Sequence, residues 1–489
     1  MSKKTVKTPN KKGEIKTKKT ANTDGIPTLS ICCTFISGLI VLTAAALSYR
    51  VYEIVSYVPD MPDIDLDAWW GPNNTKDVQD TSIRPYRIVF SEAMITDLRK
   101  RFDDYRRLKK TKTLEDAAWT YGVNSEAFGQ FFSYWIFKYK FSERERFFNT
   151  YNHFKTNIQG LDIHYVHVKP RVEKNVKVLP LLLLHGWPGS FREFYGVIPS
   201  LTTVQPGYDF VFELIIPSLP GFGYSDAPVR SGLSAVTAGV VMRNLMKRLG
   251  FEHFYVQGGD FGFLVGSSIA TMFPDEVLGF HTNLAMVMGK KTILLWLLGS
   301  LCPSLVEKDY ADRIYPIKDR LSFYWEESGY IHLQSTKPDS IGVALNESPA
   351  GLAAYILEKF VSGADINNKY VEDGGLDKQN FDDLLDNIMV YWATNSMLTS
   401  LRFYKERIIN SDIEGAMNII PTTVPAWALR LKYEIFFLPE FMIKWKFPNL
   451  RGTTTLDIGG HFAAFELPEV FANDVFKAVN SFIEFHKTG

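Results

Sequence analysis

The chain has 489 residues, and its 54 Lys and Arg residues balance 54 Asp and Glu residues. That length gives ample core for one large domain or for two to three ordinary ones, and 46% hydrophobic residues with 14% aromatics argue against a disordered chain. A formal charge of zero argues against a nucleic-acid-binding protein, and three cysteines exclude a disulfide-stabilised scaffold.

The N-terminus departs from this balance. Residues 1–20 contain eight lysines and one acid, a net charge of +7, so the remaining residues carry −7. The run from Gly25 to Tyr49 has no charged residue, and 25 helical residues span about 38 Å, enough to cross a bilayer. We therefore expect a basic tail at 1–25 and a transmembrane anchor at 26–49 that contacts membrane lipid.

The hydrophobic run also fits a cleaved signal peptide, with Ala44-Ala45-Ala46 as its cleavage site and an unusually long basic region. For an uncleaved anchor, the lysine tail, with only Arg50 close behind the span, predicts that the tail faces the cytosol. The body would then lie in the lumen or outside the cell. On that side Asn73-Asn74-Thr75 is a glycosylation sequon.

Residues 50–150 lie between the hydrophobic run and the first strong strand pattern. Residues 50–84 are rich in Pro, Asp and Trp, which predicts an extended linker. Residues 85–150 combine basic helical patterns with an aromatic stripe from Trp119 to Phe137. Such a stripe is typical of a helix that packs on a larger body.

A different pattern begins at residue 151. Residues 161–168 alternate like a half-buried strand, while 179–184 and 212–216 are short apolar runs that end in Gly or Pro turns. An amphipathic helix is expected at 234–249 and a further strand at 254–257. Strands that alternate with helices predict an α/β sheet covered on both faces.

The strand at 254–257 runs into Gly258-Gly259-Asp260-Phe261-Gly262, and a helix is expected to follow. This is the pattern of a nucleophile elbow, with Asp in place of the usual Ser. The strained turn needs flanking glycines, and the helix N-terminus keeps Asp260 ionised. Ser225 lies in a similar pattern, but that pattern follows a loop, so Ser225 is a poor nucleophile candidate.

The motif His185-Gly186-Trp187-Pro188-Gly189-Ser190 follows an apolar strand. A loop at this position supplies one backbone N–H to an oxyanion hole, here from Trp187. The residue after the nucleophile, Phe261, supplies the second. His185 fits a structural hydrogen-bonding role better than the role of a base.

A third motif, Gly459-Gly460-His461, lies near the C-terminus on a glycine-rich turn, where a catalytic base is expected. An acid between Asp260 and His461 must orient the imidazole. Glu434, Glu440 and Asp457 are the local candidates, and the motif does not choose among them.

Together, the loop at 185–190, the elbow at 258–262 and the motif at 459–466 resemble the microsomal epoxide hydrolases. That family belongs to the α/β-hydrolase superfamily and includes the juvenile hormone epoxide hydrolases of insects. The likeness covers roughly residues 60–489. It extends to Trp119-Thr120-Tyr121-Gly122, Glu327-Ser328-Gly329-Tyr330 and Arg402-Phe403-Tyr404-Lys405-Glu406.

The resemblance implies an α/β-hydrolase fold with one N-terminal transmembrane helix. The core would comprise residues 151–285 and 411–489, with a helical cap at 286–410 between them. Residues 50–150 would supply the linker and an N-terminal segment that wraps the core. Phe261 stands where the family commonly has Trp, so the backbone N–H is kept while the lining of the site changes.

The resemblance also implies the roles of single residues. By position, Asp260 is the nucleophile, His461 the base, Glu434 its charge partner, and Tyr330 and Tyr404 the proton donors to the epoxide oxygen. The implied activity is hydrolysis of lipophilic epoxides, either xenobiotics or lipids and hormones, to vicinal diols. It would need water but no metal or cofactor, and the enzyme would be anchored in the endoplasmic reticulum (microsomal) membrane.

Elementary chemistry agrees with this assignment, because a carboxylate can displace at an sp³ carbon and tyrosines, protonated at neutral pH, can donate to the alkoxide. Two alternatives stand beside it. A haloalkane dehalogenase uses the same elbow and base but binds halide with donors such as Trp N–H, so the tyrosine pair discriminates. An inactive, membrane-tethered ligand-binding homologue would have no reason to retain Asp260, Glu434 and His461 together.

Overall fold

The computed structural model describes residues 28–110 and 112–488. The chain divides into two units, residues 1–57 and 58–489, which are described separately. The basic tail predicted at 1–25 lies outside the described residues.

The first unit contains helix α1 (Thr28–Ser56). Its part from Phe35 to Ser56 is, among the described residues, the one helix that is long and apolar enough to cross a bilayer by length and composition. The helix continues past the anticipated end at residue 49, so residues 50–56 are not part of an extended linker. An ion pair of 2.8 Å joins Arg50 to Glu53 within this extension, and Pro59 is the first residue that disfavours further helix.

In the described part of the second unit, nine strands form one sheet in the order β1-β2-β3-β5-β4-β6-β7-β8-β9. The pairings β1–β2, β2–β3 and β3–β5 are antiparallel, and all others are parallel. The sequence-based strands are confirmed, most closely the one at 161–168. The strands are β1 (Arg84–Tyr86), β2 (Asn152–Ile158), β3 (Leu161–Val168), β4 (Lys177–Leu184), β5 (Phe210–Pro217), β6 (Phe254–Gly258), β7 (Val277–Thr282), β8 (Ala426–Arg430) and β9 (Leu450–Thr455).

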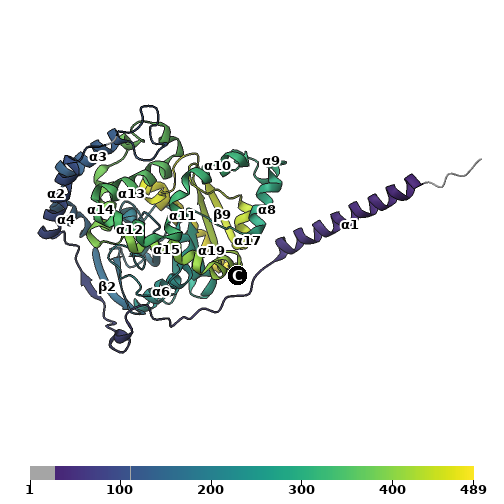
Figure 1. The fold of residues 1–489 in the computed structure, drawn as a ribbon. Helices are drawn as coiled ribbons and strands as arrows, with labels where there is room; N and C mark the ends of the chain where they lie inside the picture. The colour runs from purple at the N-terminus through teal and green to yellow at the C-terminus, as the bar shows by residue number, and fades with distance from the viewer. Residues whose placement is uncertain (1–27, 111, 489) are drawn as a thin grey trace, which may run out of the picture. The chain divides into compact units, whose positions relative to one another are not determined.

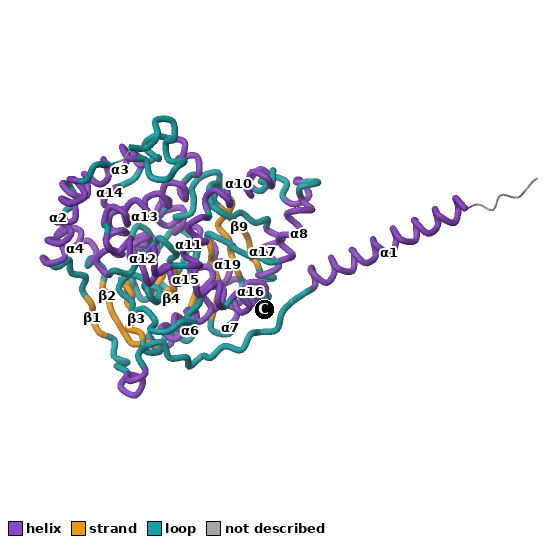
Figure 2. The backbone as a smooth tube through the Cα atoms, in the orientation of Figure 1, coloured by secondary structure: helices purple, strands orange, loops and turns teal. Residues whose placement is uncertain are grey.

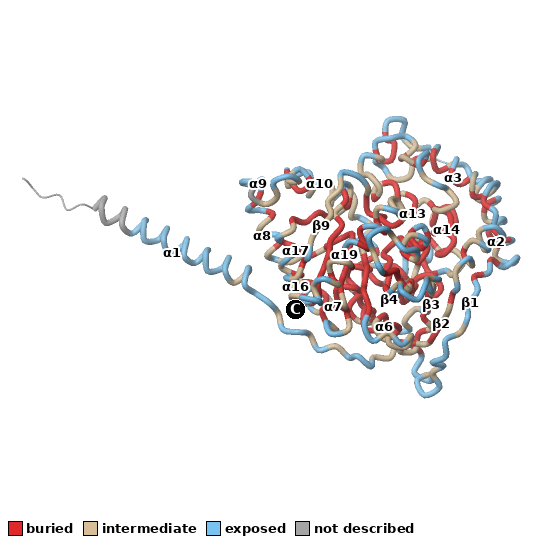
Figure 3. The backbone as a smooth tube through the Cα atoms, turned by 180° about the vertical axis from the view of Figure 1, so that it is seen from behind, coloured by how far each residue is buried: buried red, intermediate tan, exposed pale blue. Residues whose placement is uncertain are grey.

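Helices cover both faces of the sheet, and two glycines show which helix lies where. Successive strand residues face opposite sides. A Cβ at Gly279 on β7 would collide with the Phe482 ring of α19 (Pro468–Thr488), whereas the next residue, Phe280, lies against Gly266 of α7 (Phe261–Met272). Helices α19 and α7 therefore lie on opposite faces, and the central strands between them are buried (Figure 3).

The chain between β7 and β8 is a helical insertion, which we call the cap (Figure 2). Outside the cap, helix α6, which was predicted at 234–249, is observed at Ala235–Arg248, between β5 and β6. The cap comprises α8 (Lys290–Gly299), α9 (Pro303–Val306), η3 (Ala311–Arg313), α10 (Ile317–Glu327), α11 (Gly329–Thr336), α12 (Pro338–Glu347), α13 (Pro349–Ala364), η4 (Ile366–Tyr370), η5 (Leu376–Lys378), α14 (Phe381–Thr394), α15 (Met397–Ile409) and α16 (Ser411–Ile419). The remaining elements are η1 (Asn73–Val78), α2 (Glu92–Arg107), α3 (Ser125–Phe137), α4 (Phe141–Phe148), η2 (Phe191–Phe194), α5 (Ile198–Leu201), α17 (Glu440–Lys446) and α18 (Ala463–Glu466).

The segment before β2 packs on the cap. Helices α2 and α3 contact α13, and α3 also contacts α14 (Figure 1). Phe131, Phe132 and Trp135 bury the inner face of α3, which confirms the predicted packing helix. Tyr121 and Phe137, from the same aromatic stripe, remain 81% and 64% exposed, because Tyr121 precedes the helix and Phe137 ends it.

One buried carboxylate connects this segment, the core and the cap. Asp386 on α14 is fully buried. It accepts hydrogen bonds from Nε of Arg144 on α4 (2.9 Å), Nε of Arg192 on η2 (2.9 Å) and the hydroxyl of Tyr139 (3.0 Å). Asp383 also pairs with both arginines, but its side chain is partly exposed, so Asp386 is the fully buried counter-charge that the two arginines share.

Replacing Asp386 by Ala should therefore destabilise the whole body, because it removes the buried counter-charge of Arg144 and Arg192 and leaves them only the partly exposed Asp382 and Asp383. We expect a loss of about 3–5 kcal/mol in the free energy of unfolding, measured by urea titration. Asp97→Ala, which removes the exposed i,i+4 pair with Arg101, is the matched control and should change stability by less than about 1 kcal/mol. Equal losses in the two variants would contradict the role given to Asp386.

Candidate active site

The elbow predicted at 258–262 is formed by the end of β6 and the start of α7. Asp260 stands between them with φ 52° and ψ −125°, a conformation that residues other than glycine rarely adopt. A Cβ at Gly258 would collide with the Gly262 carbonyl, and one at Gly262 would collide with the carbonyl of Leu184 on β4. The two glycines are therefore what lets β4, β6 and α7 approach closely enough to form the turn.

The carboxylate of Asp260 is held by the loop predicted to supply an oxyanion hole. The backbone N–H of Trp187 donates to its Oδ1 at 2.9 Å. Burial opposes ionisation of Asp260, but His461 and the N–H groups of Trp187 and Phe261 outweigh burial, so the pKa of Asp260 is lowered. Asp260 is therefore a carboxylate at neutral pH, and the Trp187 N–H binds its Oδ1 rather than its Oδ2.

His461 follows β9 and lies between two carboxylates. Its Nε2 is 3.6 Å from Oδ2 of Asp260, and its Nδ1 is 2.7 Å from Oε1 of Glu434. Its backbone N–H donates to the carbonyl of Gly363 on α13 at 2.8 Å, so the cap helps to position the ring. Burial disfavours the imidazolium, yet Glu434 and Asp260 outweigh burial and raise the pKa of His461 well above its usual value.

The structure distinguishes among the three acids that the sequence offered as the partner of His461. Glu434 is buried, and it is the one of the three that contacts His461. Glu440 pairs with Lys444 at 2.7 Å. Asp457 pairs with Arg313 at 2.8 Å and has an 82% exposed side chain.

Tyr330 on α11 and Tyr404 on α15 bring the cap over the nucleophile. Their ring centroids are 6.0 Å apart, Trp187 stacks on Tyr330 at 5.4 Å, and Phe261 meets Tyr404 edge-on at 4.8 Å. Burial is the main reason that the pKa values of both hydroxyls are raised, and the charge of Asp260 adds to it. Both tyrosines are therefore neutral hydrogen-bond donors.

A cavity of about 540 Å³ lies between the cap and these residues, with His461, Trp187 and Tyr330 in its wall. Its charged lining residues are Glu327, Lys359 and Arg407. Apolar side chains form most of its wall: Pro188, Met286, Met288, Ile293, Trp296, Leu297, Ile317, Leu321, Phe323, Tyr324, Ile331, Ile435, Phe436 and Phe462. The cavity thus offers an apolar ligand space beside His461 and the Trp187 loop that holds Asp260.

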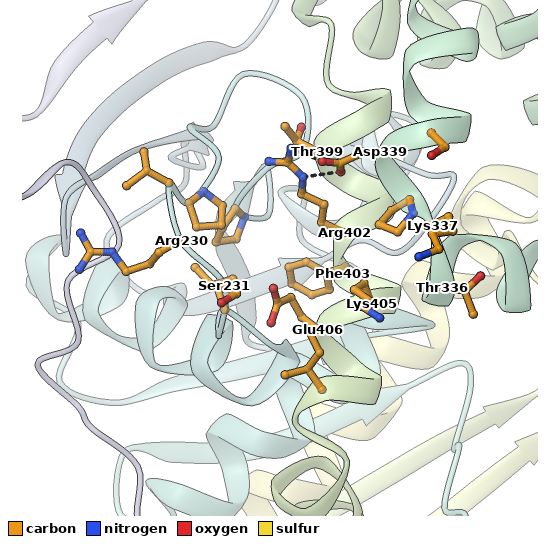
Figure 4. Close-up of a pocket in the computed structure, with 17 residues that line it drawn as sticks. Arg230, Ser231, Thr336, Lys337, Asp339, Thr399, Arg402, Phe403, Lys405 and Glu406 are labelled. Carbon is orange, nitrogen blue, oxygen red and sulfur yellow. Dashed lines mark hydrogen bonds and ion pairs between the residues drawn. The ribbon is translucent and has the colours of Figure 1, made fainter.

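A second cavity, of about 440 Å³, lies along α15 and is shown in Figure 4. Charged side chains line it, among them Arg402, which pairs with Asp339 at 2.8 Å, and Glu406, which accepts a hydrogen bond from the Gly232 backbone at 2.8 Å. None of the seven residues predicted for the site lines this cavity. Three of the seven, Trp187, Tyr330 and His461, line the apolar cavity instead.

His185 and Ser225, to which the sequence analysis gave no catalytic role, are hydrogen-bonded to backbone groups. The Nδ1 of His185 is 3.0 Å from the Gly186 carbonyl, and its Nε2 accepts from the Leu219 N–H at 3.1 Å. The Ser225 hydroxyl donates to the Ser218 carbonyl at 2.7 Å and accepts from the His164 N–H at 2.9 Å. Both side chains thus use their hydrogen bonds on backbone groups.

Comparison with known proteins gives the family. A family model described as "Epoxide hydrolase N terminus" matches residues 83–194, and one described as "alpha/beta hydrolase fold" matches residues 180–299. The juvenile hormone epoxide hydrolase of Bombyx mori is 47% identical over 87% of this chain and 92% of that protein. The chain belongs to the epoxide hydrolase family.

The similarity to members of this family extends over most of this chain, both in sequence and in structure. Epoxide hydrolase 1 of Oryctolagus cuniculus is 40% identical over 90% of this chain and 98% of its own. The crystal structure of the Bombyx mori juvenile hormone epoxide hydrolase matches with a TM-score of 0.85 and covers 86% of this chain and 100% of that one. The α/β-hydrolase fold expected from the sequence is therefore confirmed for this epoxide hydrolase.

Sequence reasoning missed the side chains that hold the loop 187–190 of this epoxide hydrolase. Asn387 on α14 accepts from the Ser190 hydroxyl and donates to the Pro188 carbonyl, each at 2.7 Å, and the Tyr391 hydroxyl donates to the Gly189 carbonyl at 2.7 Å. It also missed Glu193, whose signal was an acid among the aromatic residues Phe191, Phe194 and Tyr195 that follow the loop.

The glycine at the end of the elbow should be irreplaceable. We expect Gly262→Ala to abolish the yield of folded, active enzyme, because its Cβ would meet the Leu184 backbone, which cannot move without separating β4 from β6. Gly129→Ala on α3 is the control: its Cβ meets nothing within 4 Å and should raise stability by about 0.5–1 kcal/mol. Yield, melting temperature and epoxide turnover check both, and a folded, active Gly262→Ala enzyme would show that the turn tolerates a side chain.

Proposed function

We propose that this epoxide hydrolase converts lipophilic epoxides to vicinal diols through an ester on Asp260. The observation that carries the proposal is the position of His461 between Asp260 and Glu434, with the neutral Tyr330 in the wall of the apolar cavity and Tyr404 beside it. The apolar wall of the cavity supports a lipophilic substrate. The names of the Bombyx mori and Oryctolagus cuniculus relatives support an epoxide as its reactive group. Lipid or hormone epoxides and xenobiotic epoxides are both within this class.

The first step forms the ester. Oδ1 of Asp260 is held by the Trp187 N–H, so Oδ2 attacks an epoxide carbon, and the carbon–oxygen bond of the ring breaks. Tyr330 and Tyr404 donate to the oxygen that leaves, which would otherwise depart as a poorly stabilised alkoxide. Their raised pKa values keep the protons available for this step.

The second step hydrolyses the ester. Alkylation neutralises Asp260 and so removes one of the two negative charges that raise the pKa of His461. The imidazole of His461 then loses its proton more readily and becomes neutral. The neutral ring takes a proton from water while Glu434 holds its Nδ1 side. The negative charge that develops on Oδ1 is stabilised by the N–H groups of Trp187 and Phe261, and the ester breaks to release the diol.

The tyrosine pair favours this reaction over haloalkane dehalogenation. A halide leaving group needs no proton, whereas an epoxide oxygen needs one. Tyr330 and Tyr404 are positioned as such donors, with ring centroids 6.0 Å apart and Asp260 as a charged neighbour of both. The intact set of Asp260, Glu434 and His461 likewise favours an enzyme over an inactive ligand carrier.

Two substitutions separate the two steps. Asp260→Ala should lower diol formation by about 10⁴-fold or more, because no nucleophile remains. His461→Gln should form the ester but not hydrolyse it, so intact mass spectrometry should show a gain equal to the mass of the whole epoxide. The Asp260→Ala protein provides the control and should gain no mass; diol formation by this variant at the wild-type rate would exclude Asp260 as the nucleophile.

We further propose that α1 anchors the enzyme in the endoplasmic reticulum membrane as a single span, through which it contacts lipid. Support comes from the apolar stretch Phe35–Ser56 and from the lysine-rich tail before it. An apolar anchor also suits an enzyme whose substrates partition into lipid.

The anchor is tested by extraction of membranes at alkaline pH. The full chain should stay in the pellet, and a chain that starts at Val58 should be released, because it lacks the span. Release of the full chain would contradict anchoring. In the same membranes, a glycan at Asn73, detected by its removal with an endoglycosidase, would put the body on the lumenal side predicted by the lysine tail.

A further inference from the structure

A small cavity lies next to the nucleophile, apart from the large substrate cavity. Asp260, His461, Glu193 and Asn283 all line it. About 10 Å³ is open to the centre of a water molecule, which is about the room that one water needs. Its polar lining also meets the second requirement for bound water, two to four hydrogen-bonding partners.

Three glycines keep this space open. A Cβ at Gly186 would collide with Asp260, one at Gly259 would overlap the Asn283 amide, and one at Gly189 would lie 2.6 Å from Oε2 of Glu193. The last distance shows that the Glu193 carboxyl points at the loop that forms the oxyanion hole. Side chains at the three glycines would displace the polar groups that surround the cavity.

The carboxyl of Glu193 is held there by its neighbours. Glu193 lies on η2 between Arg192, which is fixed by Asp386, and the buried Phe194. Among the described residues, no hydrogen bond or ion pair engages its carboxyl oxygens, although the cavity places them beside His461. Burial, together with the charges of Asp260, Glu466 and Glu434, raises the pKa of Glu193 to about 8 even though His461 lowers it. A neutral carboxyl there can bind water without competing with Asp260 for the imidazolium.

We propose that this cavity binds the hydrolytic water and that Glu193 positions that water against the ester carbonyl of Asp260. The proposal rests on the ester mechanism above. The two cavities share His461 and Trp187 in their walls. Once the ester forms, its alkyl group occupies the apolar cavity, so water reaches the imidazole from the small one.

The water gives one proton to Nε2 of His461 while its oxygen bonds to Cγ of Asp260, and its second hydrogen is held by the carbonyl oxygen of Glu193. The bond between Cγ and Oδ2 then breaks, and the departing oxygen takes the proton from His461. The new Asp260 carboxyl loses the remaining water proton, and one proton returns to the tyrosine that protonated the epoxide oxygen, so the enzyme is restored. Glu193 is unchanged at the end, so it is a positioning residue.

The test is single-turnover kinetics of the full-length enzyme with an epoxide, in which formation and decay of the ester are followed by intact mass. Glu193→Leu should leave ester formation within about twofold and slow its decay by about 10–100-fold, because the water loses its alignment. Glu193→Gln keeps the amide oxygen in place and should retain decay within about threefold. Glu469→Gln, an exposed acid outside the cavity, is the control and should change neither rate.

A second variant covers the case in which Glu193→Leu does not fold. Gly189→Ala should push the Glu193 carboxyl away, while the nearest backbone atom, the Gly186 carbonyl oxygen, stays at an ordinary contact distance of 3.5 Å, and it should also slow decay selectively. Equal loss of formation and decay, or no loss in either, would overturn the role of Glu193. Absence of any ester in the His461→Gln enzyme, in which hydrolysis is blocked, would overturn the proposed mechanism itself, so the two failures are distinguishable.

Discussion

Asp260 holds a left-handed backbone conformation, with φ of 52°, that costs of order 1–3 kcal/mol for a residue other than glycine. The close packing of β4, β6 and α7, which only glycine at 258 and 262 permits, maintains it. This turn aims one carboxylate oxygen at the Trp187 N–H and the other at His461. Every later feature of the site, including the oxyanion hole and the small polar cavity, is arranged around that orientation.

In the proposed mechanism the cap does more than cover the substrate cavity. Helix α14 holds the loop 187–190 through Asn387 and Tyr391, and α13 accepts the backbone N–H of His461. The cap also carries Tyr330 and Tyr404. Binding of substrate between cap and core therefore takes place against groups that are already hydrogen-bonded in position, which is the condition for electrostatic stabilisation without reorganisation.

Local patterns were enough to predict the strands, the elbow and the histidine turn, because each depends on neighbours in sequence. The choice of Glu434 over Glu440 and Asp457 came from family resemblance, since the irregular segment after β8 has no periodicity that aims a side chain. Asp386, Asn387 and Glu193 escaped prediction for a related reason. Asp386 and Asn387 bind partners about 190–250 residues away, and Glu193 acquires its surroundings from the distant Asp260 and His461. The end of α1 was misplaced because a charged pair can continue an apolar helix.

The packing of α3 on the cap has a consequence for biosynthesis. Tyr134 on α3 hydrogen-bonds to Asp382 on α14, a residue that lies 248 positions later in the chain. At about 5–20 residues per second, the ribosome needs roughly 12–50 s to make that partner. During this interval Phe131 and Tyr134 of α3 lack Phe381, the α14 ring on which both pack. The nascent chain therefore carries the kind of transient apolar surface that makes long chains depend on chaperones, until the cap has been translated.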